Sequence, residues 1–170
     1  MKWWRAFAMG LMLGGVAWVL LIQVTRVETR VVHELAQRVD TANLRRPNPE
    51  VFNTRDVTIG GITRPSIAAS GPSRIAWDIT LPKGAWVEAY LGLPEPGLGS
   101  GGDVLFRIGT STGKLFEDLV QQVVPPATST GASEWTFVAA DLSHLSGRTI
   151  SLIFNTGGPG IWGAPRVVVR

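Results

Sequence analysis

SRIAWDITLPKGAWVEAYLGL, residues 73–93, is the stretch that decides the fold. Its apolar side chains take every second position on both sides of a short Pro-Lys-Gly turn. They are Ile75, Trp77, Ile79 and Leu81 before the turn, and Ala85, Val87, Ala89, Leu91 and Leu93 after it. Successive side chains of a strand point to opposite faces, so this spacing predicts two neighbouring strands that each bury one face.

The same period of two recurs through the chain after Pro49. Further short alternating runs surround Ile59, Phe106, Phe154 and Val167, and Gly, Pro and Ser residues separate them. Only residues 115–124 have a mixed pattern, which fits a strand or a short helical turn. Short strands separated by turn signals are typical of an antiparallel sandwich or barrel. We therefore expect residues 47–170 to form one mainly β domain.

The end of the chain resembles a known family of β domains. Residues 135–156 read WTFVAADLSHLSGRTISLIFNT, and WGAPRV follows at 162–167. This order is similar to the closing part of galactose-binding-like jelly rolls, the fold of many carbohydrate-binding modules. The resemblance implies an antiparallel jelly-roll β-sandwich. It carries little information about function, because the shared residues close the core.

The DLS segment within this motif predicts a tight turn. Asp141 and Ser143 are residue types that hydrogen-bond backbone amides in turns. Leu142 and Leu145 would fill the end of the sandwich, and Gly147 permits the chain to reverse. These residues are therefore expected to close the core.

The family resemblance also implies candidates for contact with a sugar. Members often bind sugars through loops at one end, using aromatic platforms, Arg or Asn donors, or a calcium ion. In this chain the corresponding candidates are Trp162, Asn155, Arg64 and Arg107. Trp162 follows a Gly-rich stretch, and packing in the core or against a partner competes with sugar stacking as its role. No acidic loop cluster suggests calcium.

Residues 6–24, AFAMGLMLGGVAWVLLIQV, form the longest apolar run of the chain. As a helix they would span about 28 Å, close to the ~30 Å hydrocarbon core of a bilayer. Because no small-x-small cleavage site follows, we interpret the run as a retained signal-anchor. The short basic tail, residues 1–5, predicts a cytoplasmic N-terminus. The β domain would then be periplasmic, held at a bacterial inner membrane.

Small residues repeat every four positions along this run. Ala6, Gly10 and Gly14 would share one face of a helix, and Trp18 extends that face by one turn. Small residues let a second helix approach closely, so the face predicts packing against a partner helix. The alternative is that Gly and Ala are simply common in membrane helices.

Residues 25–46 are expected to form a juxtamembrane helix and a linker. Val27, Val31 and Leu35 recur at four-residue spacing, which places them on one helix face. Pro47 disfavours helical geometry at the residue before it and would end the helix. A long isolated helix needs a surface to bury such a stripe. We expect that surface to be a partner, with the chain's own β domain or the lipid interface as alternatives.

Composition excludes several classes of function. The chain has no cysteine, which excludes disulfides and cysteine-ligated metals. Residues 1–46 carry seven basic and three acidic side chains, whereas residues 47–170 carry nine and ten. The β domain therefore lacks the basic surface of a nucleic-acid binder. Neither a nucleophile elbow nor a phosphate-binding loop occurs. We expect no catalytic residue, metal or cofactor, and no nucleic-acid partner.

These features predict a non-catalytic, single-pass accessory subunit of a larger bacterial membrane complex, such as a photosynthetic reaction-centre and light-harvesting assembly or a respiratory one. Its partners would be membrane lipid and the other subunits. The alternative is a membrane-tethered carbohydrate-binding module, whose partner would be a glycan.

Overall fold

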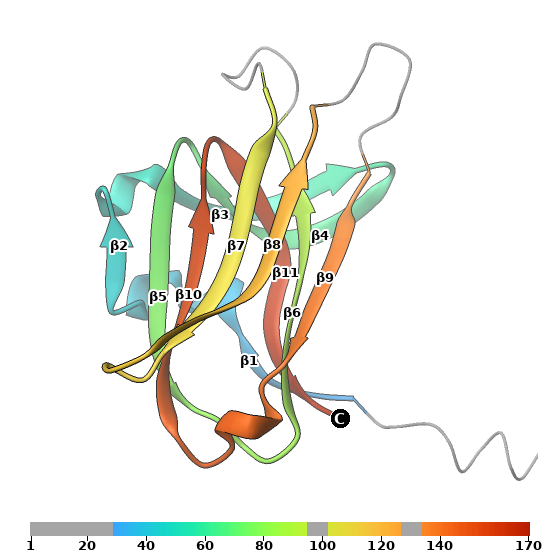
Figure 1. Cartoon of the computed structure of the whole chain (residues 1–170). Coiled ribbons are helices and arrows are strands. Elements are labelled where there is room, and N and C mark those ends of the chain that lie inside the picture. The colour runs from blue at the N-terminus through green and yellow to red at the C-terminus, as the bar shows by residue number, and fades with distance from the viewer. Residues whose placement is uncertain (1–28, 95–101, 127–133) are drawn as a thin grey trace, which may run out of the picture.

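The computed structural model describes residues 29–94, 102–126 and 134–170. In these residues two antiparallel β-sheets pack face to face, with short 3-10 turns at their margins (Figure 1). The expectation of a mainly β antiparallel sandwich is therefore confirmed. Phe116–Val124 is a strand, which decides between the two interpretations of residues 115–124.

The first sheet, sheet A, has the strand order β3-β4-β11-β6-β9, and β1 also pairs with β11. Its strands are β1 (Arg30–Glu34), β3 (Phe52–Ile59), β4 (Ile62–Ala69), β6 (Ala85–Gly92), β9 (Thr136–Asp141) and β11 (Gly160–Val169). The first part of β11 pairs with β4 and its last part with β1, while β6 covers its other edge. This long strand is the centre of the sheet.

The second sheet, sheet B, has the strand order β2-β5-β10-β7-β8. Its strands are β2 (Leu44–Arg46), β5 (Ser73–Thr80), β7 (Val104–Ser111), β8 (Phe116–Val124) and β10 (Thr149–Thr156). The chain passes from sheet A to sheet B between β4 and β5 and returns between β5 and β6, so the decisive stretch 73–93 supplies one strand to each layer.

The core lies between the sheets and is built on four aromatic residues. The Trp77 and Phe154 rings meet edge to face with centroids 5.7 Å apart, and Phe106 meets Trp162 in the same way at 4.9 Å. A third contact, 4.6 Å between the centroids of Phe154 and Trp162, joins the two pairs. Edge-to-face packing suits the ring quadrupoles. The alternating residues of 75–93 are buried around this cluster, as expected.

The DLS turn forms as the sequence predicts. The backbone N–H of Ser143 donates to Oδ1 of Asp141 at 2.8 Å. Leu142 and Leu145 are buried in the core, and Gly147 has the positive φ of 74° that the reversal requires. A 3-10 turn, η3 (Ser143–Leu145), connects the segment to β10.

The expected helix over residues 25–46 is wrong for its described part. Residues 30–34 pair with β11 as strand β1, a 3-10 turn, η1 (Leu35–Thr41), follows, and residues 44–46 are strand β2. A second 3-10 turn, η2 (Pro49–Val51), leads into β3. The physical reason is tertiary: Leu35 and Val39, spaced as on a helix, bury their side chains between the two sheets. The sandwich therefore begins at Arg30 and not at residue 47.

Several expectations concern residues outside the described part of the chain. These are the tail 1–5, the membrane-spanning run 6–24 with Ala6, Gly10, Gly14 and Trp18, and Val27 of the juxtamembrane stripe. Over the residues that the structure does describe, none of the helices has the length and apolar character needed to traverse a bilayer.

Candidate functional site

The loops of the sandwich gather at two opposite ends (Figure 1). One end carries the β4–β5 and β10–β11 connections and the end of β6; we call it the pocket end. The other carries the β5–β6 and β9–β10 connections and the start of β1; we call it the basal end. The backbone N–H of Gly157 donates to the carbonyl of Leu105 at 2.8 Å and ties two segments of the pocket end together.

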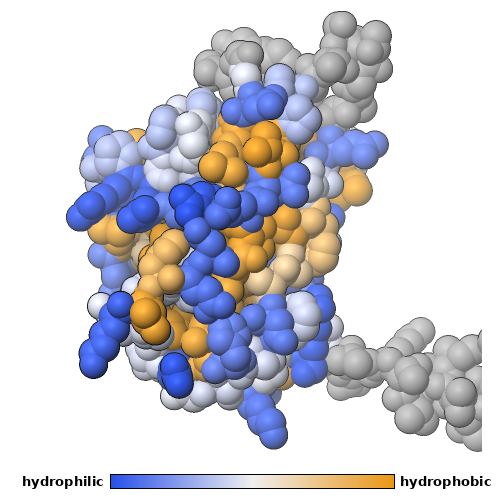
Figure 2. All heavy atoms as spheres, viewed as in Figure 1, coloured by the Kyte–Doolittle hydropathy of each residue, from blue (hydrophilic) through white to orange (hydrophobic). Residues whose placement is uncertain are grey.

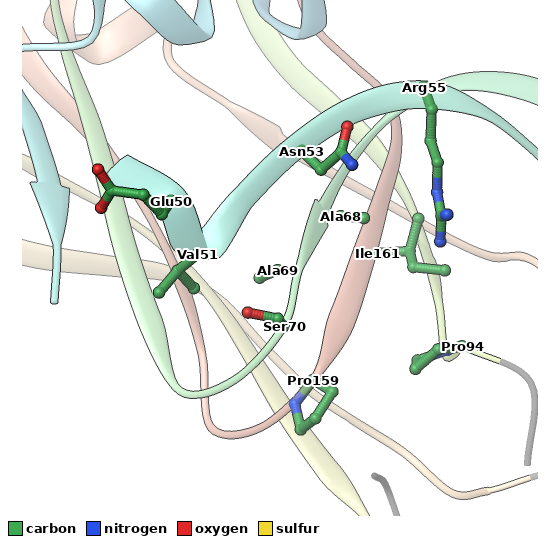
Figure 3. Close-up of a pocket in the computed structure, with 10 residues that line it drawn as sticks. All are labelled: Glu50, Val51, Asn53, Arg55, Ala68, Ala69, Ser70, Pro94, Pro159 and Ile161. Atoms are coloured by element: carbon green, nitrogen blue, oxygen red, sulfur yellow. The ribbon is translucent and has the colours of Figure 1, made fainter. Parts of the chain in front are cut away.

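A pocket of about 320 Å³ lies at the pocket end, on the outer side of sheet A (Figure 3). Its walls come from η2, β3, β4, β11 and the loops beside them. The lining residues are Glu50, Val51, Asn53, Arg55, Ala68, Ala69, Ser70, Pro94, Pro159 and Ile161. This volume is at the lower end of the ~300–1,000 Å³ range of small-molecule sites.

The sheet register builds the floor of the pocket. Asn53 of β3 lies opposite Ala68 of β4, which in turn lies opposite Ile161 of β11. These three residues therefore form one row across the outer face of sheet A. Arg55 is two positions after Asn53 and projects from the same face of β3, as Figure 3 shows. The small side chain of Ala68 leaves the space that the pocket occupies.

The pocket combines an apolar floor with polar side chains around it. Ala68 and Ile161 supply apolar surface, while Glu50, Asn53 and Arg55 supply a carboxylate, an amide and a guanidinium. Among the described residues, none of these three polar side chains forms a hydrogen bond or an ion pair with another residue. Their donors and acceptors are therefore available to a ligand.

Trp162, the candidate for sugar stacking, lies beneath this pocket and not in it. It belongs to β11, and its side chain is 1% exposed because it packs between Phe106 and Phe154. Its neighbour Ile161 points to the opposite face of the strand and lines the pocket. The expectation of a ligand contact at Trp162 is therefore wrong, and the competing interpretation of a core residue is correct.

Asn155 and Arg107 come together on the outer face of sheet B. They face each other across the β10–β7 pair, and the Asn155 side chain accepts a hydrogen bond from Arg74 Nε at 2.6 Å. Arg107 forms an ion pair with Asp118 of β8. Figure 2 shows a hydrophilic band across this face between apolar areas. On this surface these side chains therefore bond to one another.

Arg64, the fourth candidate, lies on the outer face of sheet A, away from Asn155 and Arg107. Its guanidinium carbon is 3.3 Å from the centroid of the Tyr90 ring, in cation–π geometry. The Trp135 ring lies 5.9 Å from the same carbon, and its indole N–H donates to the carbonyl of Ile62 at 2.9 Å. The four sequence candidates thus occupy three separate places and form no common site.

No motif in the sequence predicts the polar residues that line the pocket. Asn53 and Arg55 stand two positions apart in FNTRDV, residues 52–57, a signal that two polar side chains share one strand face. That signal does not show that the small side chain of Ala68, on the neighbouring strand β4, leaves space beside them. The described residues contain no group of three or more His, Asp or Glu side chains arranged to hold a metal ion.

No protein-family model and no curated protein matches the sequence. Solved structures similar to this chain include a CBM22-1 xylan-binding domain from Paenibacillus barcinonensis, with 11% identity and a TM-score of 0.47 over 75% of this chain and 85% of that one. A family 35 carbohydrate binding module from Clostridium thermocellum has 11% identity and a TM-score of 0.44 over 71% and 88%. A cleaved adhesin domain of Lys-gingipain from Porphyromonas gingivalis has 10% identity and a TM-score of 0.45 over 82% and 95%.

Proposed function

We propose that this chain is a carbohydrate-binding module whose pocket holds a small saccharide. The observation that carries the proposal is the pairing of an apolar floor, Ala68 and Ile161, with the polar side chains of Asn53, Arg55 and Glu50. A sugar ring presents an apolar C–H face and a rim of hydroxyl groups. The pocket offers a complementary surface to each.

Recognition in this proposal divides between the floor and the rim. The C–H face of a sugar ring rests on Ala68, and Ile161, which is 2% exposed, closes the floor beneath it. Burial of apolar area there favours binding. The amide of Asn53 and the guanidinium of Arg55 donate hydrogen bonds to ring and hydroxyl oxygens. The carboxylate of Glu50 accepts from hydroxyl groups, and such charge-assisted hydrogen bonds are stronger than neutral ones. A pocket with one cation and one anion suits a neutral saccharide.

The buried position of Leu35 favours a binding module over an accessory subunit. The subunit hypothesis assigned Leu35 to a partner surface, but its side chain is 0% exposed within the chain's own core. Of the same stripe, Val31 remains 39% exposed. The membrane location stays a prediction from residues 6–24: in this proposal they tether the module to a bacterial inner membrane with the β domain outside.

Binding to a glycan array tests the proposal directly. The purified full chain in detergent is applied to an array of cell-wall and plant oligosaccharides, and the affinity for the best ligand is measured by calorimetry. Asn53→Ala and Arg55→Ala are each expected to weaken binding about tenfold or more, because each removes a hydrogen bond worth roughly 1–3 kcal/mol when a charged or buried partner is left behind.

Arg74→Ala is the matched control, since it removes another strand arginine from the other sheet, and its affinity should equal that of the unaltered chain. Loss of binding in Arg107→Ala or Asn155→Ala, with Asn53→Ala unaffected, would move the site to sheet B and overturn the pocket assignment. An array on which no saccharide is retained would refute the function itself.

A further inference from the structure

The basal end of the sandwich carries a group of exposed basic side chains from five separate segments. They are Arg30, Lys83, Lys114, Arg148 and Arg170, and we call them, together with Leu115, the basal surface. Lys83, Lys114 and Arg148 lie in connections between strands, Arg30 begins β1, and Arg170 follows the end of β11. None of these residues lines the proposed saccharide pocket.

Backbone hydrogen bonds bring these segments side by side. The N–H of Arg170 donates to the carbonyl of Gly84 at 3.1 Å, next to Lys83, and Arg30 pairs with Val169. On the other side of the β5–β6 turn, the N–H of Leu81 donates to the carbonyl of Arg148 at 3.0 Å. The segments that carry Arg30, Arg170, Lys83 and Arg148 are therefore adjacent at the basal end.

The β7–β8 hairpin adds its tip to this end. His144 of η3 lies 3.0 Å from Glu117 of β8, which links the hairpin to the β9–β10 connection. A turn with the N–H of Thr112 donating to the carbonyl of Leu115 at 3.1 Å presents Lys114 and Leu115 at the tip. The Leu115 side chain is 76% exposed, the largest value among the exposed large apolar residues of the described chain.

Three acidic residues of the described chain near the basal surface have partners. Glu88 is 3% exposed and bonds to both Arg166 and Arg170. Asp141 accepts from the backbone of Ser143, and Glu117 faces His144. Lys83, Lys114 and Arg148 have no ion-pair partner among the described residues. An exposed leucine beside such lysines and arginines suits an interface where anionic groups meet apolar chains.

The sequence before β1 places the same end near a bilayer. Residues 6–24 are the apolar run that predicts a membrane span, and residue 29 adjoins β1 at the basal end. Residues 25–29 can reach at most about 17 Å even when fully extended. With the run in a bilayer, the basal surface lies close to the headgroups on the side where the domain stands.

We propose that the basal surface binds the anionic headgroups of the membrane, with Leu115 entering the headgroup layer. Arg30, Lys83, Lys114 and Arg148 neutralise lipid phosphates and carboxylates, whereas Arg170 is already paired with Glu88. Leu115 buries apolar area at their boundary. This contact sets the orientation of the sandwich: the pocket at the opposite end then faces away from the bilayer. The proposal does not depend on the identity of the pocket ligand.

A single fluorescent label on Leu115→Cys tests the contact in the full chain. The chain has no cysteine, so an environment-sensitive dye attaches at this position alone. The labelled chain is reconstituted into vesicles of phosphatidylcholine and into vesicles with one part phosphatidylserine to two parts phosphatidylcholine. We expect a blue-shifted and more intense emission in the anionic vesicles only. It should be reversed near 1 M salt, where the Debye length falls to about 3 Å.

Charge reversal supplies the matched controls. Lys83→Glu with Arg148→Glu should abolish the blue shift in anionic vesicles, while Arg46→Glu with Arg74→Glu, on sheet B away from the basal end, should preserve it. A label on Asp103→Cys at the pocket end should give the same emission in both vesicles. Equal emission from the Leu115 label in the two vesicle types, or a shift that survives the Lys83/Arg148 reversal, would overturn the proposal. Circular dichroism checks that each variant is folded.

Discussion

The indole N–H of Trp77 donates a hydrogen bond of 2.8 Å to the backbone carbonyl of Arg38. This bond joins the centre of the core to η1, the 3-10 turn between β1 and β2. The Trp77 side chain is 1% exposed, so its ring and the Arg38 carbonyl meet where water does not compete strongly. The bond therefore explains why residues 35–41 fold onto the sandwich.

Trp77→Phe should destabilise the chain by removing this bond while keeping an aromatic ring. A half-buried carbonyl left without its partner costs about 1–3 kcal/mol, and the smaller ring adds a packing loss. The measurement is the free energy of unfolding from urea titration. Trp86→Phe is the control, because Trp86 is half-buried and lies under Arg170; it should cost about 1 kcal/mol or less. Equal costs for the two variants would contradict the role of the Arg38 bond.

Leu35→Ala should cost much more stability than Val31→Ala. Leu35 is fully buried in the core, and truncation of such a side chain typically costs about 2–5 kcal/mol. That cost is a large fraction of the free energy of unfolding of a typical domain, about 5–15 kcal/mol. Val31 is 39% exposed, so its truncation should stay within about 1 kcal/mol. Urea titration of both variants measures the difference. A neutral Leu35→Ala would mean that this segment serves a partner, as the accessory-subunit hypothesis expects.

Gly163→Ala should displace the Trp135 ring from the outer face of sheet A. A Cβ at Gly163 would lie 2.6 Å from that ring, closer than van der Waals contact permits. Overpacking of this kind costs about 1–3 kcal/mol. Gly71→Ala is the control, since a Cβ there meets no atom within 4 Å, and it should change the free energy of unfolding little.

A double-mutant cycle assigns that cost to the ring. In a Trp135→Ala background the added methyl group of Gly163→Ala finds space, so most of its cost should disappear. A cost that stays unchanged in this background would place the strain in the backbone of β11 instead.

His33 should make the sandwich less stable as the pH falls. Burial, with the charge of nearby Arg38 as a second cause, lowers the pKa of His33 below its usual 6.5. Arg38 also lies 2.8 Å from Nδ1, which in the neutral ring accepts its hydrogen bond. The unfolded chain then binds the proton more readily, so stability is complete above about pH 6.5 and declines as the pH falls towards the lowered pKa.

Thermal unfolding between pH 8 and pH 5 measures this effect. The midpoint should fall with pH in the unaltered chain, and the slope should be smaller in His33→Gln, which carries no titrating ring. Parallel slopes for the two proteins would exclude His33 as the source.

Local patterning was sufficient to predict the strands of the sandwich and its DLS turn. The alternation through residues 73–93 and the turn from Asp141 to Gly147 both depend on neighbours along the chain. A period of two determines which side chains share a face, and Asp, Ser and Gly have turn preferences of their own. Both features depend only on residues that are close together in the sequence. The main β strands and most of the core can therefore be predicted from them.

The same patterning was insufficient wherever a contact between distant segments decides the outcome. Val31, Leu35 and Val39 fit a helical stripe, but the segment forms a strand and a 3-10 turn. Its strand pairs with β11, and its 3-10 turn accepts a hydrogen bond from Trp77. Trp162 follows glycines that resemble a loop, yet the pairing of β11 with β4 and β6 buries it.

The sequence by itself therefore determined the β-sandwich, its alternating core and its closing turn. Only the tertiary structure decided where the pocket lies, that Asn53 and Arg55 border it, and that residues 30–46 belong to the domain. The physical reason is that a strand's own side chains define its two faces, whereas a pocket arises from side chains of η2, β3, β4 and β11 that meet only when the sheets assemble.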